Sequence, residues 1–518
     1  MDRMGMKGAA VWATGLLLTV GVHAVWVWLD GRPPVWDMAY HELQGWRYLE
    51  AWRQGELVGK FAELSDYYPP LYYLQEAFIL RLFPGTKWLA LLSNVPGLLL
   101  LSGGTFLLAG RFLDPVPAAL AGLLPLWFPL VAWSARVSLL DLTLAGWVAL
   151  AGYLVLKSES FSRRGWTLCF GAASAAGCLT KWTFPLFLLP LVIWALVFGG
   201  RRKETLRNLG LAAALAAPLF LWWAVPNAGS LAERFAVTSQ AALWEGDPGW
   251  ETFLGWIYYP RVLAGYYFFL PLTALFVAGA VTRTVGNGDL PAGFLSWWLV
   301  GGMLLLTLMA AKDARYAMPL AVPAAVLLVA FWKERPVWLG IAALVGIIQF
   351  LSVSLVTPLH PFKAALFDLA EDPEYRSMRQ EWVLYSTHHF GLAGPPARED
   401  WRHGEIAADL PSGALVGFVP DLPYFNPLTF ELVATRGGKR LEVVTLNEGG
   451  DSLEILKELD FVVGKSGSQG VDFSGGARRR IYGILQESGW LMIRSELLPD
   501  GSRAELWQNQ ARFIRQSG

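Results

Sequence analysis

The chain of 518 residues is 54% hydrophobic and 16% charged, and its 42 basic and 42 acidic residues cancel. Soluble chains are typically about 25% charged and nucleic-acid-binding proteins usually carry a basic excess, so the composition disfavours a soluble globule and predicts no nucleic-acid partner. The two cysteines, Cys169 and Cys178, are too few for a disulfide framework. We therefore predict a polytopic membrane protein.

Long apolar segments fill the first 357 residues and are almost absent afterwards. Most of them have the roughly 17–25 residues of a membrane-spanning helix, and several are short. They predict about eleven transmembrane helices, at 9–29, 88–110, 116–133, 141–157, 166–180, 183–199, 207–225, 262–282, 291–311, 315–332 and 336–357. We expect the first to be an uncleaved helix rather than a signal peptide, because it lacks a small-residue cleavage site.

The segment 71–83 is apolar but too short to cross a membrane, since as a helix it covers only roughly 20 Å. Gln75, Glu76 and Arg81 also interrupt it. We predict an interfacial helix that lies along the membrane surface, within a long first loop at 30–87.

The orientation follows from the basic residues. Lys and Arg are more than twice as dense in the loops on the side of the N-terminus as in the others, and the positive-inside rule places the dense side in the cytoplasm. We therefore predict a multi-pass protein of the plasma (inner) membrane with a cytoplasmic N-terminus. Its transmembrane domain covers 1–357, and a C-terminal domain at 358–518 is extracytoplasmic.

This orientation collects the unusual polar residues of the membrane domain on the outer face. They are Asp37, His41 and Tyr68 in the first loop, Asp141 and Lys181 in the next two outer turns, and Arg315 and Tyr316 in the fifth. Charged groups at the ends of apolar helices are costly in lipid, so they tend to face a cavity and mark functional sites.

Each charged residue also has a structural interpretation. Asp37 and Asp141 could cap helices, Lys181 could extend its ammonium group to the interface, and Arg315 could be an ordinary helix-end charge. His41 lies one turn after Asp37 on the same helix face and could be a hydrogen-bonding residue or a metal ligand. Taken together, two acids and two cations suit chemistry on a phosphate, because a carboxylate can accept the proton of a hydroxyl nucleophile while Lys and Arg neutralise a leaving phosphate.

Several short motifs follow one another in a fixed order: Asp37, YPPLYY at 68–73, SARxxxxD at 134–141, the helix end from Gly177 to Lys181, and ARYAMPL at 314–320. In this order they resemble the glycosyltransferase C superfamily, and within it the branch of the protein O-mannosyltransferases and the lipid A aminoarabinose transferase. The resemblance covers about 30–335. It implies a GT-C-like multi-helix membrane fold whose members take sugars from polyprenyl-phosphate carriers on the outer face.

The resemblance also implies roles for the polar residues. The expected catalytic residues match the family's acids in the first and second outer loops, and they are Asp37 and Asp141. The expected substrate-binding residues are Lys181, Arg315, Tyr316, His41 and Tyr68.

Two positions depart from the family pattern. Met38 follows Asp37 where the family often has a second acid, and Tyr68 stands where it often has a histidine before the Pro-Pro pair. Both departures leave open whether a divalent metal takes part and which residue binds it.

The residues from 376 onwards read as a small α/β domain. We predict strands at 414–419, 441–446 and 460–463, helices at 426–434, 452–458 and 477–487, and a hairpin of 490–494 with 503–508. The tripeptide Gly464-Lys465-Ser466 is not expected to be a phosphate loop, because Leu459 stands where such a loop needs glycine.

We predict a membrane glycosyltransferase that moves a sugar from a polyprenyl-phosphate carrier to a lipid, glycan or protein acceptor, with inversion at the anomeric carbon. The alternative is a transporter or flippase for a lipid-linked or anionic solute. A transporter would be expected to show two related halves with interrupted helices, whereas this sequence shows no internal repeat and its charges lie at helix ends. A non-catalytic scaffold would not need these charges on one side.

Overall fold

The computed structural model describes residues 3–199, 202–244, 246–284, 290–355, 395–446, 454–467, 469–470, 477–487 and 489–512. The chain divides into two compact units. We call Met1–Trp28, Glu50–Ile79 and Trp88–Pro395 the helical unit, and Leu29–Leu49, Leu80–Lys87 and Pro396–Gly518 the sheet unit. The domain boundary predicted at 357/358 lies outside the described residues and stays a prediction.

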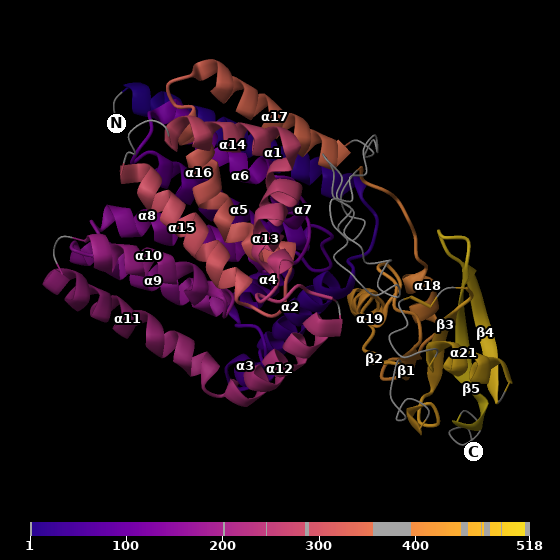
Figure 1. Ribbon diagram of the computed structural model, residues 1–518. Helices are drawn as coiled ribbons and strands as arrows, with labels where there is room; N and C mark the ends of the chain where they lie inside the picture. The colour runs from indigo at the N-terminus through magenta and orange to yellow at the C-terminus, as the bar shows by residue number, and fades with distance from the viewer. Residues whose placement is uncertain are drawn as a thin grey trace. The chain divides into compact units, whose positions relative to one another are not determined.

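Within the described residues the helical unit is formed by helices (Figure 1), of which α2 and α4, and α1 by its last residue, also extend into the sheet unit. In chain order they are α1 (Arg3–Leu29), α2 (Trp36–Gln54), α3 (Leu57–Leu64), α4 (Leu71–Leu82), α5 (Leu89–Ala109), α6 (Pro115–Trp127), α7 (Pro129–Ser134), α8 (Asp141–Lys157), α9 (Arg164–Thr180), α10 (Phe184–Phe198), α11 (Arg202–Ala224), α12 (Ala228–Trp244), α13 (Phe253–Val262), the π-helix η1 (Leu263–Phe268), α14 (Phe269–Thr284), α15 (Leu290–Thr307), the 3₁₀-helix η2 (Ala314–Leu320), α16 (Ala321–Phe331) and α17 (Pro336–Leu355).

Every predicted transmembrane segment coincides with one helix or with consecutive helices, which confirms that these segments are helical. Within the described residues, six helical segments are long and apolar enough to cross a bilayer: Gly5–Leu29, Leu89–Ala109, Lys203–Ala224, Phe253–Thr282, Ala314–Phe331 and Pro336–Leu355. Further apolar helices, among them Pro115–Trp127 and Phe184–Phe198, are shorter. The chain is a polytopic helical membrane protein, and the count of eleven crossings stays a prediction.

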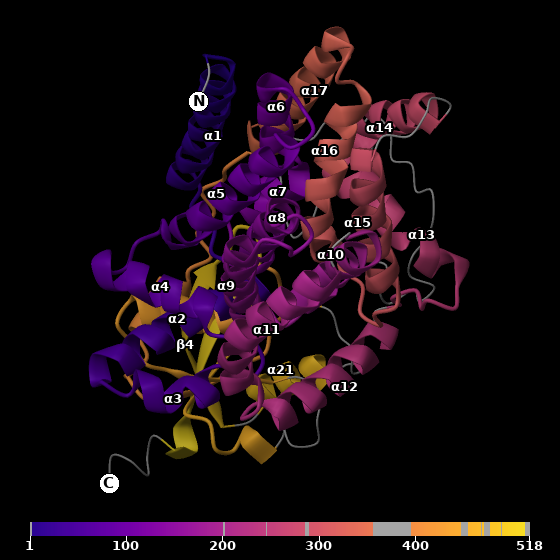
Figure 2. The same cartoon turned by 90° about the vertical axis from the view of Figure 1, so that its left-hand side faces the viewer.

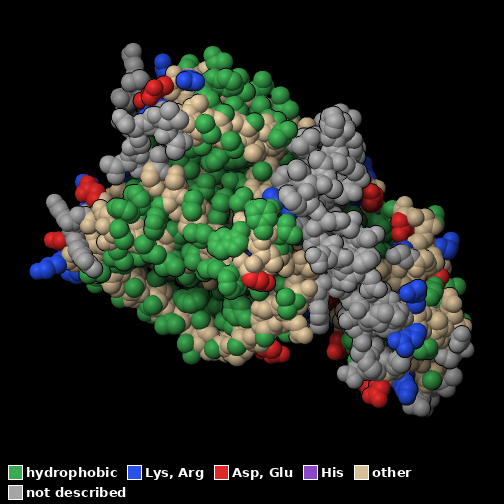
Figure 3. Space-filling view, viewed as in Figure 1, with side chains coloured by type: hydrophobic (Ala, Val, Ile, Leu, Met, Phe, Trp, Pro, Cys, Tyr) green, Lys and Arg blue, Asp and Glu red, His purple; other side chains and the backbone are tan. Residues whose placement is uncertain are grey.

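The surface of the helical unit is that of a lipid-facing protein. Hydrophobic side chains predominate over the helical unit on the face that Figure 3 shows. On α1, Leu17, Leu18 and Trp28 are 72%, 66% and 60% exposed. Lipid can solvate such side chains without the free-energy cost that water imposes.

Small residues allow α5 and α8 to approach closely. A Cβ added to Gly146 would lie 2.8 Å from the carbonyl oxygen of Gly97, and one added to Gly97 would lie 2.9 Å from Oγ1 of Thr143. These distances leave no room for a methyl group, so both glycines set the depth of the helix contact. α8 also packs against α9, and α9 lies beside α11 in Figures 1 and 2.

Three predicted spans are interrupted. Pro129 lacks an N–H group and keeps Phe128 out of the helical region, at φ −68° and ψ 132°, which separates α6 from α7. The segment 262–282 contains η1, and the residue after it, Phe269, has a φ of +51° in the left-handed region. The segment 315–332 begins with η2 before it continues as α16.

The sheet unit contains a five-stranded mixed sheet in the order β2-β1-β3-β5-β4. The strands are β1 (Leu415–Phe418), β2 (Glu442–Thr445), β3 (Phe461–Lys465), β4 (Trp490–Leu497) and β5 (Arg503–Asn509), and the helices are α18 (His403–Ala408), α19 (Pro427–Arg436) and α21 (Ala477–Glu487). β1 pairs in parallel with β2 and β3, whereas β3, β5 and β4 are antiparallel.

This arrangement confirms the predicted strands, the hairpin and the helices at 426–434 and 477–487. The predicted helix at 452–458 begins outside the described residues. Lys465, which belongs to the tempting tripeptide, ends β3 and is 2% exposed, and its Nζ lies 2.9 Å from Oδ2 of Asp500. It is a structural residue of the strand, in agreement with the rejection of a phosphate loop.

Candidate active site

Asp141 and Lys181 stand at adjacent ends of two neighbouring helices. Asp141 is the first residue of α8, and Lys181 is the C-cap of α9. A carboxylate at a helix N-terminus and an ammonium group at a C-terminus both interact favourably with the helix dipole. Because α8 and α9 pack together, the two side chains meet, with Lys181 Nζ 2.7 Å from Asp141 Oδ1.

This ion pair is buried. The side chains of Lys181 and Asp141 are only 5% and 4% exposed. Lys181 therefore does not extend to the interface, and Asp141 lies inside the first turn of α8, whose N-cap is Leu140. Two charges leave water only if they are paired or hydrogen-bonded, and here each neutralises the other.

Tyr316 joins this pair from η2, which packs against α8. The ammonium nitrogen of Lys181 lies 4.9 Å from the centroid of the Tyr316 ring, within the range of a cation–π interaction. Arg315 precedes Tyr316 in the chain, so η2 brings a second cation to the neighbourhood of the first. The ion pair and the aromatic ring form a group of three residues, Asp141, Lys181 and Tyr316, which we call the Lys181 cluster.

The backbone around Arg315 is fixed from two sides. The side chain of Asp313 caps η2 by accepting a hydrogen bond of 2.7 Å from the Arg315 backbone N–H, and it also accepts one of 2.8 Å from Arg315 Nε. The hydroxyl of Tyr267, which is fully buried in η1, donates to the carbonyl oxygen of Ala314 at 2.9 Å. Both contacts fix the backbone position from which the Arg315 side chain extends.

Tyr68 is linked to the Lys181 cluster through its neighbour. The Tyr67 and Tyr68 rings are 4.4 Å apart between centroids, and Tyr67 lies 6.2 Å from the ring of Trp182, the residue after Lys181. The aromatic wall on this side of the cluster is therefore formed by Tyr67 as well as by the predicted Tyr68.

Asn94 of α5 connects two of the sequence motifs. Its Nδ2 donates to the carbonyl oxygens of Ser134 and Val137 at 3.0 and 2.7 Å, and its Oδ1 accepts a 3.3 Å hydrogen bond from Tyr72. Asn94 thereby holds the chain segment that leads into Asp141.

Arg136 of the SARxxxxD motif has other partners. Its Nε donates to Nδ1 of His23 at 3.1 Å, a terminal nitrogen donates to Ser354, and the guanidinium group lies 4.7 Å from the Trp26 ring centroid. These partners come from α1 and α17, so Arg136 joins these two helices.

Asp37 and His41 belong to the sheet unit. Asp37 lies in the first turn of α2, directly after Trp36, and His41 follows one turn later. His41 is 3% exposed, and its ring lies 5.4 Å from that of Tyr40. The structure thus brings Asp141, Lys181 and Tyr316 together in the helical unit. Arg315 precedes Tyr316 in the chain, and Tyr68 is linked to the cluster through Tyr67 and Trp182. Asp37 and His41 form part of the other unit.

The described part of the chain contains no group of three or more His, Cys, Asp or Glu side chains that could hold a metal ion. A hard divalent cation can also take water and substrate oxygens as ligands. A metal at Asp37 or Asp141 would therefore depend on such additional ligands.

Three residues near the cluster were missed by the sequence interpretation: Asp313, Asn94 and Tyr267. Asp313 carried a signal, because an acid two residues before Arg315 can fold back on its backbone as an Asx-type turn. Asn94 was also recognisable, because an amide side chain inside an apolar span needs hydrogen-bond partners. Tyr267 carried no such signal, since its role depends on η1.

Comparison with known proteins shows where this architecture recurs. The model of the family described as dolichyl-phosphate-mannose-protein mannosyltransferase matches residues 68–225. Two curated relatives are both undecaprenyl phosphate-alpha-4-amino-4-deoxy-L-arabinose arabinosyl transferase 2, from the Pseudomonas fluorescens strains Pf0-1 and Pf-5. They are 28% identical over 237 residues and 29% identical over 229 residues.

These alignments cover 43% and 42% of this chain and 42% and 38% of the relatives, so the matched region spans less than half of each curated relative. Solved structures match over more of the chain. ArnT from Cupriavidus metallidurans bound to undecaprenyl phosphate has a TM-score of 0.59 at 16% identity, with 98% of both chains covered. The same protein in the apo state has a TM-score of 0.60 at 18% identity and covers 96% of this chain and 99% of its own.

The archaeal oligosaccharyltransferase AglB from Archaeoglobus fulgidus, in complex with an inhibitory peptide and a dolichol-phosphate, has a TM-score of 0.53 at 13% identity, and covers 88% of this chain and 69% of its own. At these identities the structural likeness shows the fold. It confirms the GT-C-like fold class with a C-terminal α/β region. The family match and the relatives also confirm the resemblance to the mannosyltransferase and aminoarabinose-transferase branch.

Proposed function

We propose that this protein is a membrane glycosyltransferase that moves a sugar from a polyprenyl-phosphate carrier to a lipid, glycan or protein acceptor. The observation that carries the proposal is the buried Lys181, which is held at a helix end by Asp141 and Tyr316 with Arg315 nearby. Two cations at helix ends in an apolar unit suit a carrier phosphate whose isoprenoid chain lies in lipid. The names of the similar proteins, which include an undecaprenyl-phosphate complex, support this substrate class.

In the proposed reaction Lys181 and Arg315 bind the donor phosphate. An acceptor hydroxyl or amine forms a bond to the anomeric carbon while the bond from that carbon to the phosphate oxygen breaks. The bonding electrons stay on the phosphate, where the two cations stabilise the charge, and the acceptor proton passes to Asp37 as general base. A single displacement of this kind inverts the anomeric carbon.

Asp141 has a different role in this proposal. At 2.7 Å from Lys181 its carboxylate is already engaged, so it orients the ammonium group rather than removing the acceptor proton. Tyr316 and the Tyr67–Tyr68 pair supply aromatic surface against which a sugar ring can pack.

We further propose that the chain is a multi-pass protein of the plasma membrane with its N-terminus in the cytoplasm. Basic residues are concentrated in the loops on that side. The region 358–518 and the acceptor reaction then lie on the extracytoplasmic side.

The experiment that tests this function measures loss of sugar from a defined donor. Purified full-length protein is incubated separately with undecaprenyl phosphate-α-4-amino-4-deoxy-L-arabinose and dolichyl-phosphate-mannose, in the presence of lipid A or a membrane extract, and free carrier is quantified by mass spectrometry. We expect protein-dependent release of the carrier phosphate with one donor. Movement of an intact donor across liposomes without cleavage would instead establish the flippase alternative.

A further inference from the structure

The first half of α2, which carries Asp37, packs against α19 within the sheet unit. Ala39 and Leu43 of α2 form a buried cluster with Leu432 of α19, and all three are at most 2% exposed. Trp46 and Leu428 extend this cluster at its margin. This contact joins residues nearly 400 positions apart in the sequence.

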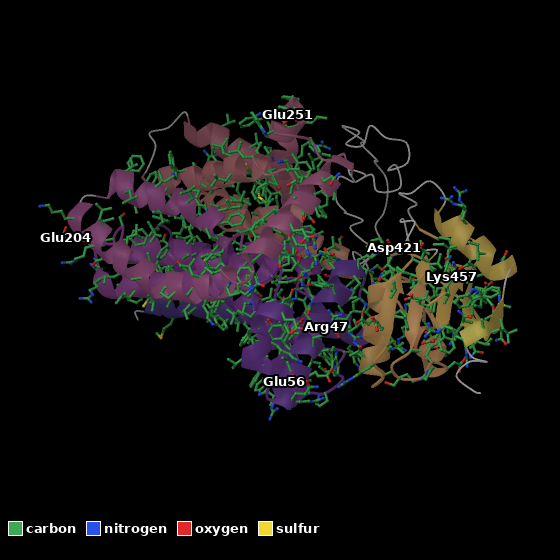
Figure 4. All side chains as sticks on the ribbon, turned by 90° about the horizontal axis from the view of Figure 1, so that it is seen from below. Arg47, Glu56, Glu204, Glu251, Asp421 and Lys457 are labelled. Carbon is green, nitrogen blue, oxygen red and sulfur yellow. The ribbon has the colours of Figure 1, made fainter. Side chains whose placement is uncertain are left out.

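A buried ion pair reinforces the apolar contact. Arg436, at the end of α19, donates from both Nε and Nη2 to Oε1 of Glu42, with a distance of 2.8 Å from Nε. The Glu42 side chain is only 3% exposed. A second pair, Arg47 Nη2 with Glu431 Oε1 at 3.0 Å, lies nearer solvent, and Figure 4 labels Arg47.

Hydrogen bonds also hold the start of α2. Trp36 has a φ of +31°, a left-handed conformation that is strained for a residue with a side chain. Its indole Nε1 donates to Oδ1 of Asp421 at 2.7 Å, and the hydroxyl of Thr429 donates to the carbonyl oxygen of Pro34 at 2.8 Å. Figure 4 labels Asp421. These bonds hold the strained backbone at the residue immediately before Asp37.

The side of α2 that contacts α19 is opposite to the side that carries Asp37. Successive helical residues are rotated by about 100°, which places Ala39, Glu42 and Leu43 on one side of the helix. Asp37 and His41 lie on the opposite side. The contact with α19 therefore fixes the rotation of α2 about its axis and leaves its Asp37 side directed away from α19.

We propose that the C-terminal α/β region is the part of the protein that positions Asp37, with Arg436 and Asp421 as positioning residues. The inference rests on the proposed function, in which Asp37 is the general base. Glu42 is also a positioning residue and does not touch substrate, because its carboxylate is bound to Arg436.

The first test measures the order of α2 without any substrate. Hydrogen exchange of the peptide covering 33–49 is followed in the full-length protein and in Arg436→Gln, Asp421→Ala and the control Arg480→Gln, which changes an exposed arginine of α21. We expect exchange to rise by about tenfold or more in the first two variants, because a buried charge or a strained turn loses its partner. Unchanged exchange in both would overturn the proposal.

The second test asks whether Arg436 acts through Asp37. With the donor that is cleaved by the native protein, Arg436→Gln should lower kcat by about tenfold or more while KM for the donor changes little. In the Asp37→Asn background the same substitution should have little further effect, since the group that it positions is already inactive. Arg436→Lys should restore part of the turnover, because it keeps the charge but loses the fork.

The two hypotheses fail in different ways. If no donor is cleaved by the native protein, the proposed function is wrong, and the exchange experiment still decides whether the C-terminal region holds α2. If Arg436→Gln lowers turnover by the same factor in the native and in the Asp37→Asn backgrounds, Arg436 does not act through Asp37 and the positioning role is refuted.

Discussion

Replacing the buried pair Asp141–Lys181 by apolar residues should separate its structural contribution from its function. At 2.7 Å and an effective dielectric constant of about 20, the attraction between two unit charges is about 6 kcal/mol. Removing both groups from water costs several kcal/mol per ion, so the net stabilisation by the pair is close to zero. Loss of one partner leaves an uncompensated buried charge.

We therefore expect Lys181→Met and Asp141→Leu each to lower the free energy of unfolding by about 3–5 kcal/mol, whereas the double variant should be as stable as the native protein or more so. Unfolding is measured by titration with SDS in mixed micelles. The double variant still lacks the ammonium group, so its affinity for undecaprenyl phosphate should fall by about 10- to 100-fold, the value of a hydrogen bond to a charged group.

Different outcomes contradict different steps of this reasoning. Single variants with native stability would mean that the pair is not buried as described. A double variant as unstable as the sum of both single variants would mean that the two groups do not act as a pair. Native affinity of the double variant for undecaprenyl phosphate would remove Lys181 from the phosphate site, whatever its stability.

Further predictions concern the base, the second cation, the orientation and the effect of pH. Asp37→Asn keeps the shape of the side chain but not its basicity, so turnover of the cleaved donor should fall by about 10²–10⁴-fold, with native hydrogen exchange as the control for folding. Arg315→Ala should weaken binding of undecaprenyl phosphate, and Arg315→Lys should be impaired as well because the guanidinium fork is lost; native affinity in both would exclude this residue. A reporter that is active only in the periplasm, fused after residue 518, should be active, and a signal from a cytoplasmic reporter instead would reverse the topology. Burial lowers the pKa of His403 to about 4, so the unfolded state binds a proton first and stability should decline as the pH falls from about 6.5 to about 4, by about 3 kcal/mol in total. His403→Gln should reduce this decline in unfolding experiments at several pH values, and an unchanged pH dependence would show that another group is responsible.

The positions of the helices could be read from the sequence because apolar length is a direct requirement of the bilayer. The interruption at Pro129 also has a visible chemical cause. The π-helix before Phe269 does not, since its local sequence is aromatic and apolar like any other span.

The site was predictable in part. Asp141 and Lys181 could be placed at helix ends by counting spans, but their ion pair depends on how α8 packs against its neighbours. Gly97 and Gly146 set the depth of the α5–α8 contact through the absence of a side chain. Sequence alone does not show which residue lies opposite a glycine.

The association of residues 29–49 with the C-terminal region could not be predicted. Glu42 and Arg436 are separated by 394 positions, and neither lies in a motif that indicates a partner. Each charge was individually compatible with an exposed loop, and only the tertiary contact buries Glu42.

The number of residues in the π-helix η1, rather than the identity of their side chains, helps to shape the turn at Arg315. A π-helix accommodates an additional residue in its turn, and this surplus places the Tyr267 hydroxyl on the carbonyl oxygen of Ala314. Deleting one residue between Leu263 and Tyr266 would allow a regular α-helix with about 100° per residue, and the side chains of this turn would then change direction. Tyr267 would then face another neighbour even though it had not been mutated. A chain with one residue fewer at this point must anchor its arginine by other means, so insertions and deletions here alter the site as surely as substitutions within it.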